Sequence, residues 1–362
     1  MAMSDSPIVI WGAGAMGGTL AAYWIRAGKS VLLVDNNPAH VAAINQQGLR
    51  ISGPIEEFVV SAKAVLPEQL FTSGAQGERV AEQYPRIFLC TKAQHTEAAC
   101  RTLAAHLAPL GEVVSVQNGL NELIIADIVG ESRCIGCFIN FGADILEPGH
   151  IHYAGRGAVV VGELNGTLTP RLADIHHLMQ LFEPNAQQTT QIFSYLWGKL
   201  GYGAILFGTA LTNESIVDVL SHPDYRAVLI AIGKEVCAVA EAANIPLEGF
   251  NGFHPPAFRA DAAMADSNAS MDAMVEFNRR SAKTHSGIWR DLAIHKRKTE
   301  VDQQLGVIVA KAAQLGIATP LLQAVITGIH QIEQGTALSW SNLDQVAALL
   351  NPSFSSSTRS DQ

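Results

Sequence analysis

The sequence predicts an α/β fold in which a doubly wound, mostly parallel sheet is followed by an all-α domain. Short apolar, β-type runs alternate with helical segments through the first half of the chain, a pattern typical of a parallel sheet covered by helices. From about Thr190 the strand-like runs cease, and helical periodicity continues through Leu350. The length of 362 residues is too great for one ordinary core and agrees with two domains.

The pattern is clearest over Pro7–Asp35, PIVIWGAGAMGGTLAAYWIRAGKSVLLVD. We expect a strand over Pro7–Trp11, then a glycine turn, a helix over Thr19–Ala27 and a second strand over Ser30–Val34. A strand, a glycine turn and a helix in this order are typical of a Rossmann-type sheet that binds a dinucleotide.

The glycine turn GAGAMG fits the pattern G-x-G-x-x-G. Gly12 permits the tight turn, Gly14 lets the backbone approach a pyrophosphate, and Gly17 lets the helix pack closely on the strand. The helix that follows offers N–H groups and the positive end of its dipole to the phosphates. The whole turn is therefore a predicted cofactor site, comprising Gly12, Ala13, Gly14, Ala15, Met16 and Gly17.

An acidic residue ends the second strand. Asp35 lies twenty-one positions after Gly14, where a carboxylate meets the ribose of adenosine. Such a carboxylate hydrogen-bonds a 2′-hydroxyl and repels a 2′-phosphate. Asp35 and Asn36 are therefore predicted cofactor-binding residues that favour NAD over NADP, while Lys92 and Arg26 remain as cations able to reach a phosphate.

The first domain, expected over residues 1–190, continues with further strands and helices. We expect a short helix over Ala39–Gln47, a hairpin of Leu49–Ile55 with Phe58–Ala62, and an amphipathic helix over Thr96–Leu110. Further predicted strands are Pro85–Thr91, Glu112–Val116, Cys134–Phe141 and Ala158–Glu163.

Two polar residues follow two of these strands. Lys92 comes directly after the strand Pro85–Thr91, and Asn118 follows the strand Glu112–Val116 within Gln117-Asn118-Gly119. In doubly wound sheets, ligands bind beyond the carboxyl ends of the strands. We therefore expect Lys92 and Asn118 on the rim where a cofactor lies.

The second domain, expected over residues 191–351, is predicted to be helical. Phe193–Leu220 indicates one long helix or a broken pair. The further predicted helices are Asp224–Ala243, Ser270–Phe277, Ser281–His295, Thr299–Leu315 and Leu321–Gln334. At the termini, Met1–Ser6 is expected to be a loose lead, and residues 352–362 a disordered polar tail.

The composition excludes several classes of function. A hydrophobic fraction of 48% and a charged fraction of 16% are typical of a well-buried globular protein. The net charge of −9, without a basic run, argues against nucleic acid and anionic membranes as partners. No uncharged apolar run is long enough to span a membrane, and the N-terminus lacks the features of a signal peptide.

The cysteines and histidines predict no metal site. An odd, scattered count of five cysteines indicates reduced thiols and a cytoplasmic location. Cys134 and Cys137 form C-x-x-C, but no second pair completes a zinc pattern. The histidine pairs 150/152 and 176/177 lack acids at a fitting spacing.

Several motifs, in their order and spacing, make the chain resemble the ketopantoate reductase family (2-dehydropantoate 2-reductases). The resemblance runs from about Ile8 to Gln334. Its motifs are GAGAMG, FLCTKA with Lys92, QNGL with Asn118, EPGHI with GRGAVVVGE, WGKL with Lys199, HSGIWRD with Ser286, and KRKTEVD with Glu300.

The resemblance implies a Rossmann domain, a helical domain and an active site in the cleft between them. It also implies reduction of a 2-oxo acid to a 2-hydroxy acid with NADPH, as in pantothenate biosynthesis. Lys199 then matches the catalytic lysine, and Lys92 matches a position beside the cofactor. Asn118, Ser286 and Glu300 match polar residues around cofactor and substrate, so that Asn118 and Glu300 are counted for both.

The chemistry agrees with these roles. Hydride delivery to a ketone builds negative charge on its oxygen, and a lysine there both meets the charge and supplies a proton. Without the motifs, Lys199 would be interpreted as a snorkelling surface lysine, Asn118 as a turn residue, and Glu300 as a first-turn acid capped by Thr299. Ser286 would be an ordinary helix serine. Of the histidines, only His285, beside Ser286, is expected near the site, as a second polar contact.

The chain departs from the family at the positions four and eight residues after Lys199. The reductases usually have asparagines there, whereas this chain has Gly203 and Phe207. We count both as substrate-binding and expect the site to lose two amides and gain an aromatic wall. The expected substrate is therefore a bulkier or more apolar 2-oxo acid, or a related ketone, in place of ketopantoate.

Two other functions remain open from the sequence. One is an NAD-dependent dehydrogenase that oxidises a 2-hydroxy acid or another alcohol in catabolism, which an NADH preference would suit. The other is a dinucleotide-binding sensor without catalysis, which the loss of the asparagines permits. The apolar C-terminal helices would suit a homodimer, although a monomer core has the same pattern.

Overall fold

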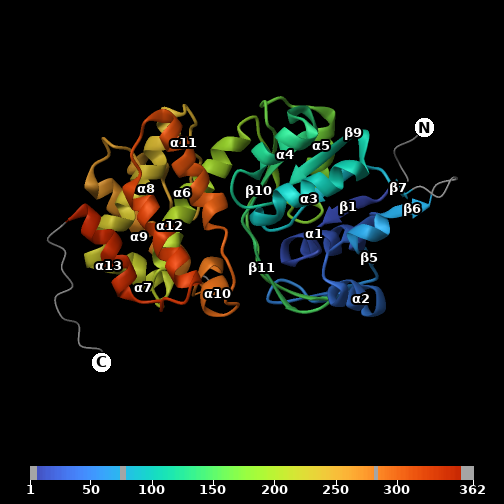
Figure 1. Ribbon diagram of the computed structural model, residues 1–362, viewed down its shortest axis with the longest axis horizontal. Helices are drawn as coiled ribbons and strands as arrows, with labels where there is room; N and C mark the ends of the chain where they lie inside the picture. Colours follow the sequence, from blue (N-terminus) through green and yellow to red (C-terminus); the bar gives the residue numbers. More distant parts are fainter. Residues whose placement is uncertain (1–5, 74–78, 281–283, 352–362) are drawn as a thin grey trace. The chain divides into compact units, whose positions relative to one another are not determined.

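The computed structural model describes residues 6–73, 79–280 and 284–351. Its internal contacts divide the chain into two units, Met1–Ile192 and Phe193–Gln362 (Figure 1). Most of the expected N-terminal lead, the start of the helix expected over Ser281–His295, and the expected C-terminal tail lie outside the described residues.

The first unit contains an eight-stranded sheet in the order β14-β13-β10-β9-β8-β1-β2-β5. Its strands pair in parallel except for β10 and β13, which are antiparallel. The mostly parallel sheet predicted from the sequence is confirmed. The strands are β1 (Ile8–Trp11), β2 (Val31–Val34), β5 (Lys63–Val65), β8 (Tyr84–Leu89), β9 (Leu107–Ser115), β10 (Cys134–Ile139), β13 (Val159–Glu163) and β14 (Gln187–Gln188).

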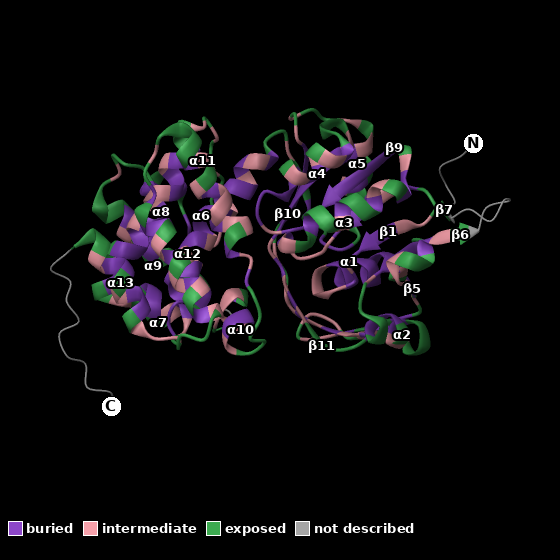
Figure 2. Ribbon diagram, viewed as in Figure 1, coloured by how far each residue is buried: buried purple, intermediate pink, exposed green. Residues whose placement is uncertain are grey.

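Helices cover both faces of this sheet. Successive strand residues point to opposite faces, so Val9 and Trp11 of β1 belong to one core and Ile10 belongs to the other. Helices α3 (Thr96–Leu103) and α4 (Asn121–Val129) fill the first core. Helices α1 (Ala15–Arg26) and α5 (Pro170–Gln180) fill the second. Buried residues in Figure 2 follow the central strands, whereas α3 and α4 present exposed residues outward.

Cys134 and Cys137 illustrate this alternation. Cys134 packs in the core of α3 and α4, whereas Cys137 packs in the core of α1 and α5. Residues three apart on a strand face opposite sides of the sheet. The C-x-x-C spacing on β10 therefore separates the two thiols and does not bring them together.

A second sheet of four strands, in the order β11-β12-β3-β4, covers α1. The predicted hairpin is present as β3 (Leu49–Ser52) and β4 (Phe58–Val60), with shorter strands than expected. The expected strand Cys134–Phe141 ends as β10 at Ile139, and a separate strand, β11, follows it. The added strands are β11 (Gly142–Glu147) with β12 (His150–Gly155), and a small pair of β6 (Phe71–Ser73) with β7 (Arg79–Ala81).

The helix expected over Thr96–Leu110 is wrong in its second half. Helix α3 ends at Leu103, a 3₁₀ turn follows, and β9 begins at Leu107, which pairs with Tyr84. Pro109 lacks a backbone N–H and is unfavourable inside a helix. Leu110, which the helical pattern counted as apolar, is 93% exposed.

A buried ion pair fixes α5 to the sheet. Glu163, the last residue of β13, accepts hydrogen bonds from the Arg171 guanidinium and the Thr169 hydroxyl. Burial opposes the charge, but these hydrogen bonds more than offset it and hold the pKa of Glu163 below its ordinary value of 4.5. The pair therefore stabilises the fold at neutral pH, and this stabilisation is lost as the pH falls through the lowered pKa.

The change Glu163→Gln is expected to lower the free energy of unfolding by about 3 kcal/mol at pH 7, because it leaves the Arg171 charge without its partner. Urea unfolding at pH 7 and pH 3 measures this, and the difference from wild type should shrink at pH 3. The exposed Glu131 supplies the control change Glu131→Gln, which should leave stability unaltered. Equal effects of the two changes would contradict the assignment.

The second unit is built of helices, apart from one β-bridge between Phe250 and Phe253 among its described residues. The region 193–220 is a broken pair, in which α6 ends at Thr209 and the Ser215 hydroxyl caps α7. The helices are α6 (Ile192–Thr209), α7 (Ile216–Ser221), α8 (Pro223–Ala242), α9 (Met264–Arg279), α10 (Gly287–Ala293), α11 (Val307–Leu315), α12 (Pro320–Glu333) and α13 (Trp340–Leu350) (Figure 1). A π-helical turn over Asp302–Gly306 precedes α11.

Candidate functional site

The glycine turn links β1 to α1 and has the geometry that its sequence predicts. Gly12 has φ +100°, a conformation that favours glycine. A Cβ at Gly17 would overlap the carbonyl oxygen of Gly12 and lie 2.8 Å from Ile10 Cγ2. Gly14 is the N-cap of α1, and no side chain caps this helix end. Its first N–H groups are therefore placed to bind an anion.

The backbone N–H and the carbonyl of Ala13, which belong to two consecutive peptide groups, both make hydrogen bonds to side chains. Its N–H donates to Asp35 Oδ2 at 2.9 Å, and the other carboxylate oxygen accepts from the N–H of Asn37 at 2.9 Å. His40, which is buried, accepts a hydrogen bond from the N–H of Gly149 at Nδ1, at 3.0 Å. Its Nε2 therefore carries the hydrogen and donates to the carbonyl oxygen of Ala13 at 2.9 Å.

Asp35 is thus immobilised at the carboxyl end of β2, beside the glycine turn. Each of its carboxylate oxygens has lone pairs beyond the one that accepts a backbone N–H, so it can still accept bonds from hydroxyl groups. Asn36 is exposed next to it. The end of β2 therefore presents a fixed negative charge to any ligand bound along the turn.

Arg26 does not lie near the glycine turn. It ends α1, about 16 Å along the helix axis from the first residue of that helix. Its guanidinium pairs with Glu56 and lies 4.6 Å from the ring centre of Tyr23 and 4.1 Å from that of Phe58. The expectation that Arg26 reaches a cofactor phosphate is therefore wrong.

A buried polar network joins the carboxyl ends of β8 and β9. The Gln117 amide donates to the carbonyl oxygen of Thr91 and to the Thr96 hydroxyl, both at 2.8 Å. The Thr96 hydroxyl donates to Asn121 Oδ1, and the Asn121 amide donates to the carbonyl oxygen of Asn118. The network fixes the segments that carry Lys92 and Asn118.

These residues lie at one edge of the sheet. The neighbouring strands β9, β8, β1 and β2 are parallel, so their carboxyl ends meet there. A Cβ at Gly12 would lie 2.9 Å from the backbone of Cys90 and Thr91, which lead to Lys92. The structure thus brings the glycine turn, Asp35, Lys92 and Asn118 to the same edge.

In the second unit, Lys199 lies on α6, half-buried, between the buried residues Gly198 and Leu200. Gly203 is also half-buried and lies about 40° around the helix from Lys199. Phe207 is completely buried, contrary to the expected aromatic wall. Eight residues turn a helix by about 80° beyond two full turns, which takes Phe207 away from the face of Lys199. Leu206, seven residues on, lies closer to that face and is half-buried.

Ser286 begins α10 as its N-cap and is not a residue of the helix interior. Its hydroxyl accepts from the N–H of Trp289 at 3.1 Å and keeps its own hydrogen to donate. The neighbouring His285 stacks on Trp289 with ring centres 4.0 Å apart. The Trp289 indole donates to Asn213 Oδ1 at 3.2 Å. Ser286 is therefore flanked by a half-buried aromatic pair and an amide.

Glu300 directly precedes the helical segment that runs from Val301 to Leu315. The N–H and the hydroxyl of Thr299 both donate to Glu333 Oε1, at 2.7 and 2.8 Å. The Thr299 hydroxyl also accepts from the N–H of Val301 at 3.3 Å, so the expected Thr299 cap is present. Two contacts from α12 thus hold the residue before Glu300.

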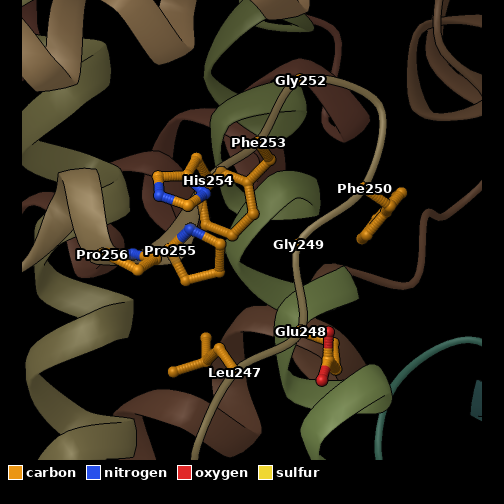
Figure 3. Close-up of a pocket in the computed structure, with 9 residues that line it drawn as sticks. All are labelled: Leu247, Glu248, Gly249, Phe250, Gly252, Phe253, His254, Pro255 and Pro256. Carbon is orange, nitrogen blue, oxygen red and sulfur yellow. The ribbon is translucent and has the colours of Figure 1, made fainter.

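A hollow of about 460 Å³ lies along the loop 247–256, which follows α8 (Figure 3). This loop packs on the face of α6 that carries Gly198 and Gly201, where a Cβ at Gly201 would lie 2.7 Å from the Phe253 ring. None of the predicted site residues lines this hollow. We therefore do not place the reaction there.

The sequence analysis missed three groups of residues that support the site. Gln117 is part of the motif QNGL, and its position directly after a predicted strand could have indicated a role at the site. His40 and Gly149 are 109 residues apart, and no local pattern predicts their contact. Gln304 packs on Gly203 across a similar separation.

Within the described residues, no group of three or more His, Cys, Asp and Glu side chains is arranged to hold a metal ion. No helix in the same part of the chain has the length and apolar character needed to cross a membrane.

Two family models match the chain. Residues 8–166 match "Ketopantoate reductase PanE/ApbA", and residues 191–333 match "Ketopantoate reductase PanE/ApbA C terminal". Together they cover most of the chain and both of its units. Their limits leave residues 167–190 between the two matches.

Curated relatives match over nearly their whole length. The 2-dehydropantoate 2-reductase of Pyrococcus abyssi is 28% identical over 336 residues, which cover 90% of this chain and 98% of that protein. The enzyme of the same name from Archaeoglobus fulgidus is 26% identical over 333 residues and covers 91% and 98%.

Solved structures show the same fold. A ternary structure of D-mandelate dehydrogenase with NADH and anilino(oxo)acetate has a TM-score of 0.76 at 22% identity, covering 91% of this chain and 98% of that one. A PanE/ApbA family ketopantoate reductase from Ralstonia eutropha JMP134 has a TM-score of 0.75 at 22% identity with the same coverage.

Proposed function

The chain belongs to the ketopantoate reductase family, and from this premise we propose that it reduces a 2-oxo acid to a 2-hydroxy acid with NADH. Membership in the family supports the activity of an NAD(P)H-dependent reductase of 2-oxo acids. The choice of NADH is the finer part of the proposal. The observation that carries it is the fixed Asp35 carboxylate at the end of β2, held by the N–H groups of Ala13 and Asn37.

The first unit fits a dinucleotide. The uncapped start of α1 suits a pyrophosphate, and Asp35 suits the two ribose hydroxyls of an adenosine. A 2′-phosphate at the same place would face the Asp35 charge, and Arg26 is too far along α1 to offset it. Lys92 is the remaining cation that we predict beside the cofactor.

The second unit supplies the groups that act on the substrate. When bound, the cofactor supplies the hydride. In the proposal, the Lys199 ammonium meets the negative charge on the ketone oxygen and donates the proton from Nζ. The Ser286 hydroxyl has a hydrogen to donate to the substrate, because its role as N-cap uses only an oxygen lone pair. Glu300 lies at the start of its helix as a further polar contact.

The proposed substrate is more apolar than ketopantoate. Gly203 replaces an amide on α6, and the half-buried Leu206 lies near the Lys199 face. The aromatic pair His285 and Trp289 flanks Ser286. An α6 face without amides discriminates weakly in favour of a hydroxylated substrate. We therefore propose an aliphatic or aromatic 2-oxo acid without a hydroxyl group.

The cofactor preference is tested by assaying a panel of 2-oxo acids with NADH and NADPH in parallel. We expect kcat/KM to be about 10- to 100-fold higher with NADH, because the Asp35 charge repels the 2′-phosphate. The change Asp35→Ser should reduce or reverse this ratio, whereas Asp127→Ser at an exposed position of α4 should not. An equal or better kcat/KM with NADPH in the wild type would refute the preference.

The panel also decides the substrate class. It should include ketopantoate, straight and branched aliphatic 2-oxo acids, and a phenyl-substituted one. Ketopantoate giving the highest kcat/KM of the panel would exclude the proposed divergence. Assay of the matching 2-hydroxy acids with NAD⁺ tests the alternative of a catabolic dehydrogenase.

We further propose a cytoplasmic location, which the five cysteines support because none forms a disulfide and mostly buried, reduced thiols suit a reducing compartment. A homodimer stays a prediction, and sedimentation of the full chain tests it.

A further inference from the structure

We infer that Gln304 is a substrate-contacting residue whose side-chain amide takes the place that an amide on α6 would hold at position 203. The amide donates to the carboxylate of the 2-oxo acid and so contributes to specificity. This inference rests on the proposed function and adds to it a group that binds the acid end of the substrate.

The first observation is the contact between Gln304 and Gly203. A Cβ built at Gly203 would lie 3.6 Å from Gln304 Oε1, which is ordinary van der Waals contact. Gly203 is four residues after Lys199, which corresponds to about 6 Å along α6. The Gln304 amide therefore occupies the space above Gly203, one turn from the lysine. A larger side chain at position 203 would compete for this space.

The second observation is the position of Gln304 relative to Glu300. The N–H of Gln304 donates to the carbonyl oxygen of Glu300 at 3.0 Å, so the two residues are one turn apart. Gly203 on α6 thus lies beside Gln304 on the later helix, and Lys199 and Glu300 each come one turn before these residues. The turn Asp302–Gly306 is π-helical, a rare conformation that is frequent at functional sites.

The third observation is that the Gln304 amide is available to make hydrogen bonds to a ligand. Its side chain is half-buried and makes no hydrogen bond with the residues that the structure describes. A primary amide has two N–H donors and an acceptor oxygen. Rotation of the amide exchanges its oxygen and nitrogen, so that the N–H donors can face the substrate or Gly203.

The chemistry of a 2-oxo acid indicates which of its groups the Gln304 amide would bind. In a 2-oxo acid the carboxylate carbon is bonded directly to the ketone carbon. A group that meets the ketone oxygen, as Lys199 is proposed to do, therefore places the carboxylate within a few ångströms. An amide N–H donates well to an ionised carboxylate and can do so without bringing a second positive charge beside Lys199.

The test replaces Gln304 by methionine, which has similar length and no amide. We expect KM for the best 2-oxo acid to rise about 10- to 100-fold, as for the loss of a hydrogen bond to a charged group. KM for NADH and the melting temperature should stay close to wild type. The matched control is Gln303→Met, at the neighbouring residue of the same turn, which should leave all of these values unchanged.

Two further variants separate contact from structure. Gln304→Glu keeps the shape and adds a negative charge, so it should weaken substrate binding more than methionine does. The double change G203N/Q304A moves the amide back onto α6 and should recover a substantial part of the affinity that Gln304→Ala loses. A KM for 2-oxo acids that Gln304→Met leaves unaltered would overturn the inference.

Binding of oxamate to the NADH-loaded protein keeps this test independent of turnover. Oxamate carries the carboxylate and the adjacent carbonyl of a 2-oxo acid but is not reduced. We expect Gln304→Met to raise its dissociation constant about 10- to 100-fold. Wild-type protein that binds oxamate but reduces no acid of the panel would contradict the proposed function alone. Oxamate binding that is absent, or equal in both proteins, would contradict the role of Gln304.

Discussion

Replacing Lys199 by alanine is expected to lower kcat for 2-oxo acid reduction by about two to four orders of magnitude. The change removes the group that we propose to meet the charge on the ketone oxygen and to donate the proton. Lys199 is half-buried on α6 between buried neighbours, where the field of an ammonium is screened less than in open solvent. KM for NADH should change little, because the predicted dinucleotide contacts belong to the first unit.

Steady-state kinetics with the best acid of the panel measures this effect, together with NADH binding by fluorescence. Lys311→Ala on α11 is a suitable control, because this lysine is half-buried on a helix of the same unit and lies outside the predicted site. Lys199→Arg keeps the charge but is a poorer proton donor, and should recover only part of kcat. If the wild type bound NADH tightly and turned over no substrate at all, the protein would be a sensor.

The second large effect is expected at Gly17. Alanine at this position would place its Cβ against the Gly12 carbonyl oxygen, 2.8 Å from Ile10 Cγ2 and 2.9 Å from Cys90 Cβ. Since these atoms belong to β1, to the residue that follows β8 and to the backbone of the turn, α1 must shift away from β1. We expect a loss of about 1–3 kcal/mol in the free energy of unfolding, or more, and at least about a 100-fold rise in KM for NADH.

The change Gly14→Ala separates the effect on stability from the effect on NADH binding. Its Cβ would have only Ile145 Cδ1 as a neighbour, at 4.0 Å, and the φ of −62° at Gly14 is open to alanine. This variant should therefore fold with wild-type stability and still lose NADH affinity, because the Cβ projects where the pyrophosphate approaches. Thermal unfolding with and without NADH measures both quantities. Equal melting temperatures for Gly17→Ala and Gly14→Ala would contradict the packing role of Gly17.

Those parts of the fold that depend on local pattern were predictable from the sequence. The turn Gly12–Gly17, the strand before it and Asp35 at the end of β2 follow from residue type and spacing within thirty residues of one another. The first half of the helix at Thr96 was equally clear. The error began after Leu103, where the helix ends and the pairing of Leu107 with Tyr84 outweighs a helical pattern.

The second sheet was harder to predict from the sequence because its strands pair with strands far away in the chain. Ile151 of β12 pairs with Ile51 of β3, one hundred residues earlier, and the strands themselves are short. In the candidate site, Lys199 was predicted from the family motif WGKL and Gly203 from its helical spacing to Lys199, but the same spacing was carried too far at the buried Phe207. Gln304 was missed because its relation to Gly203 depends on packing between two helices and on a π-helical turn.

The two side-chain hydrogen bonds to the backbone of Ala13 have a consequence for how a ligand binds. In many proteins a phosphate-binding loop is mobile when empty, and part of the binding free energy is spent in ordering it. Here Asp35 and His40 bind the N–H and the carbonyl of Ala13 and so fix two consecutive peptide groups, and His40 also accepts from the N–H of Gly149 in the turn between β11 and β12. The loss of loop entropy is therefore incurred when the chain folds, and a dinucleotide meets a turn that is already ordered.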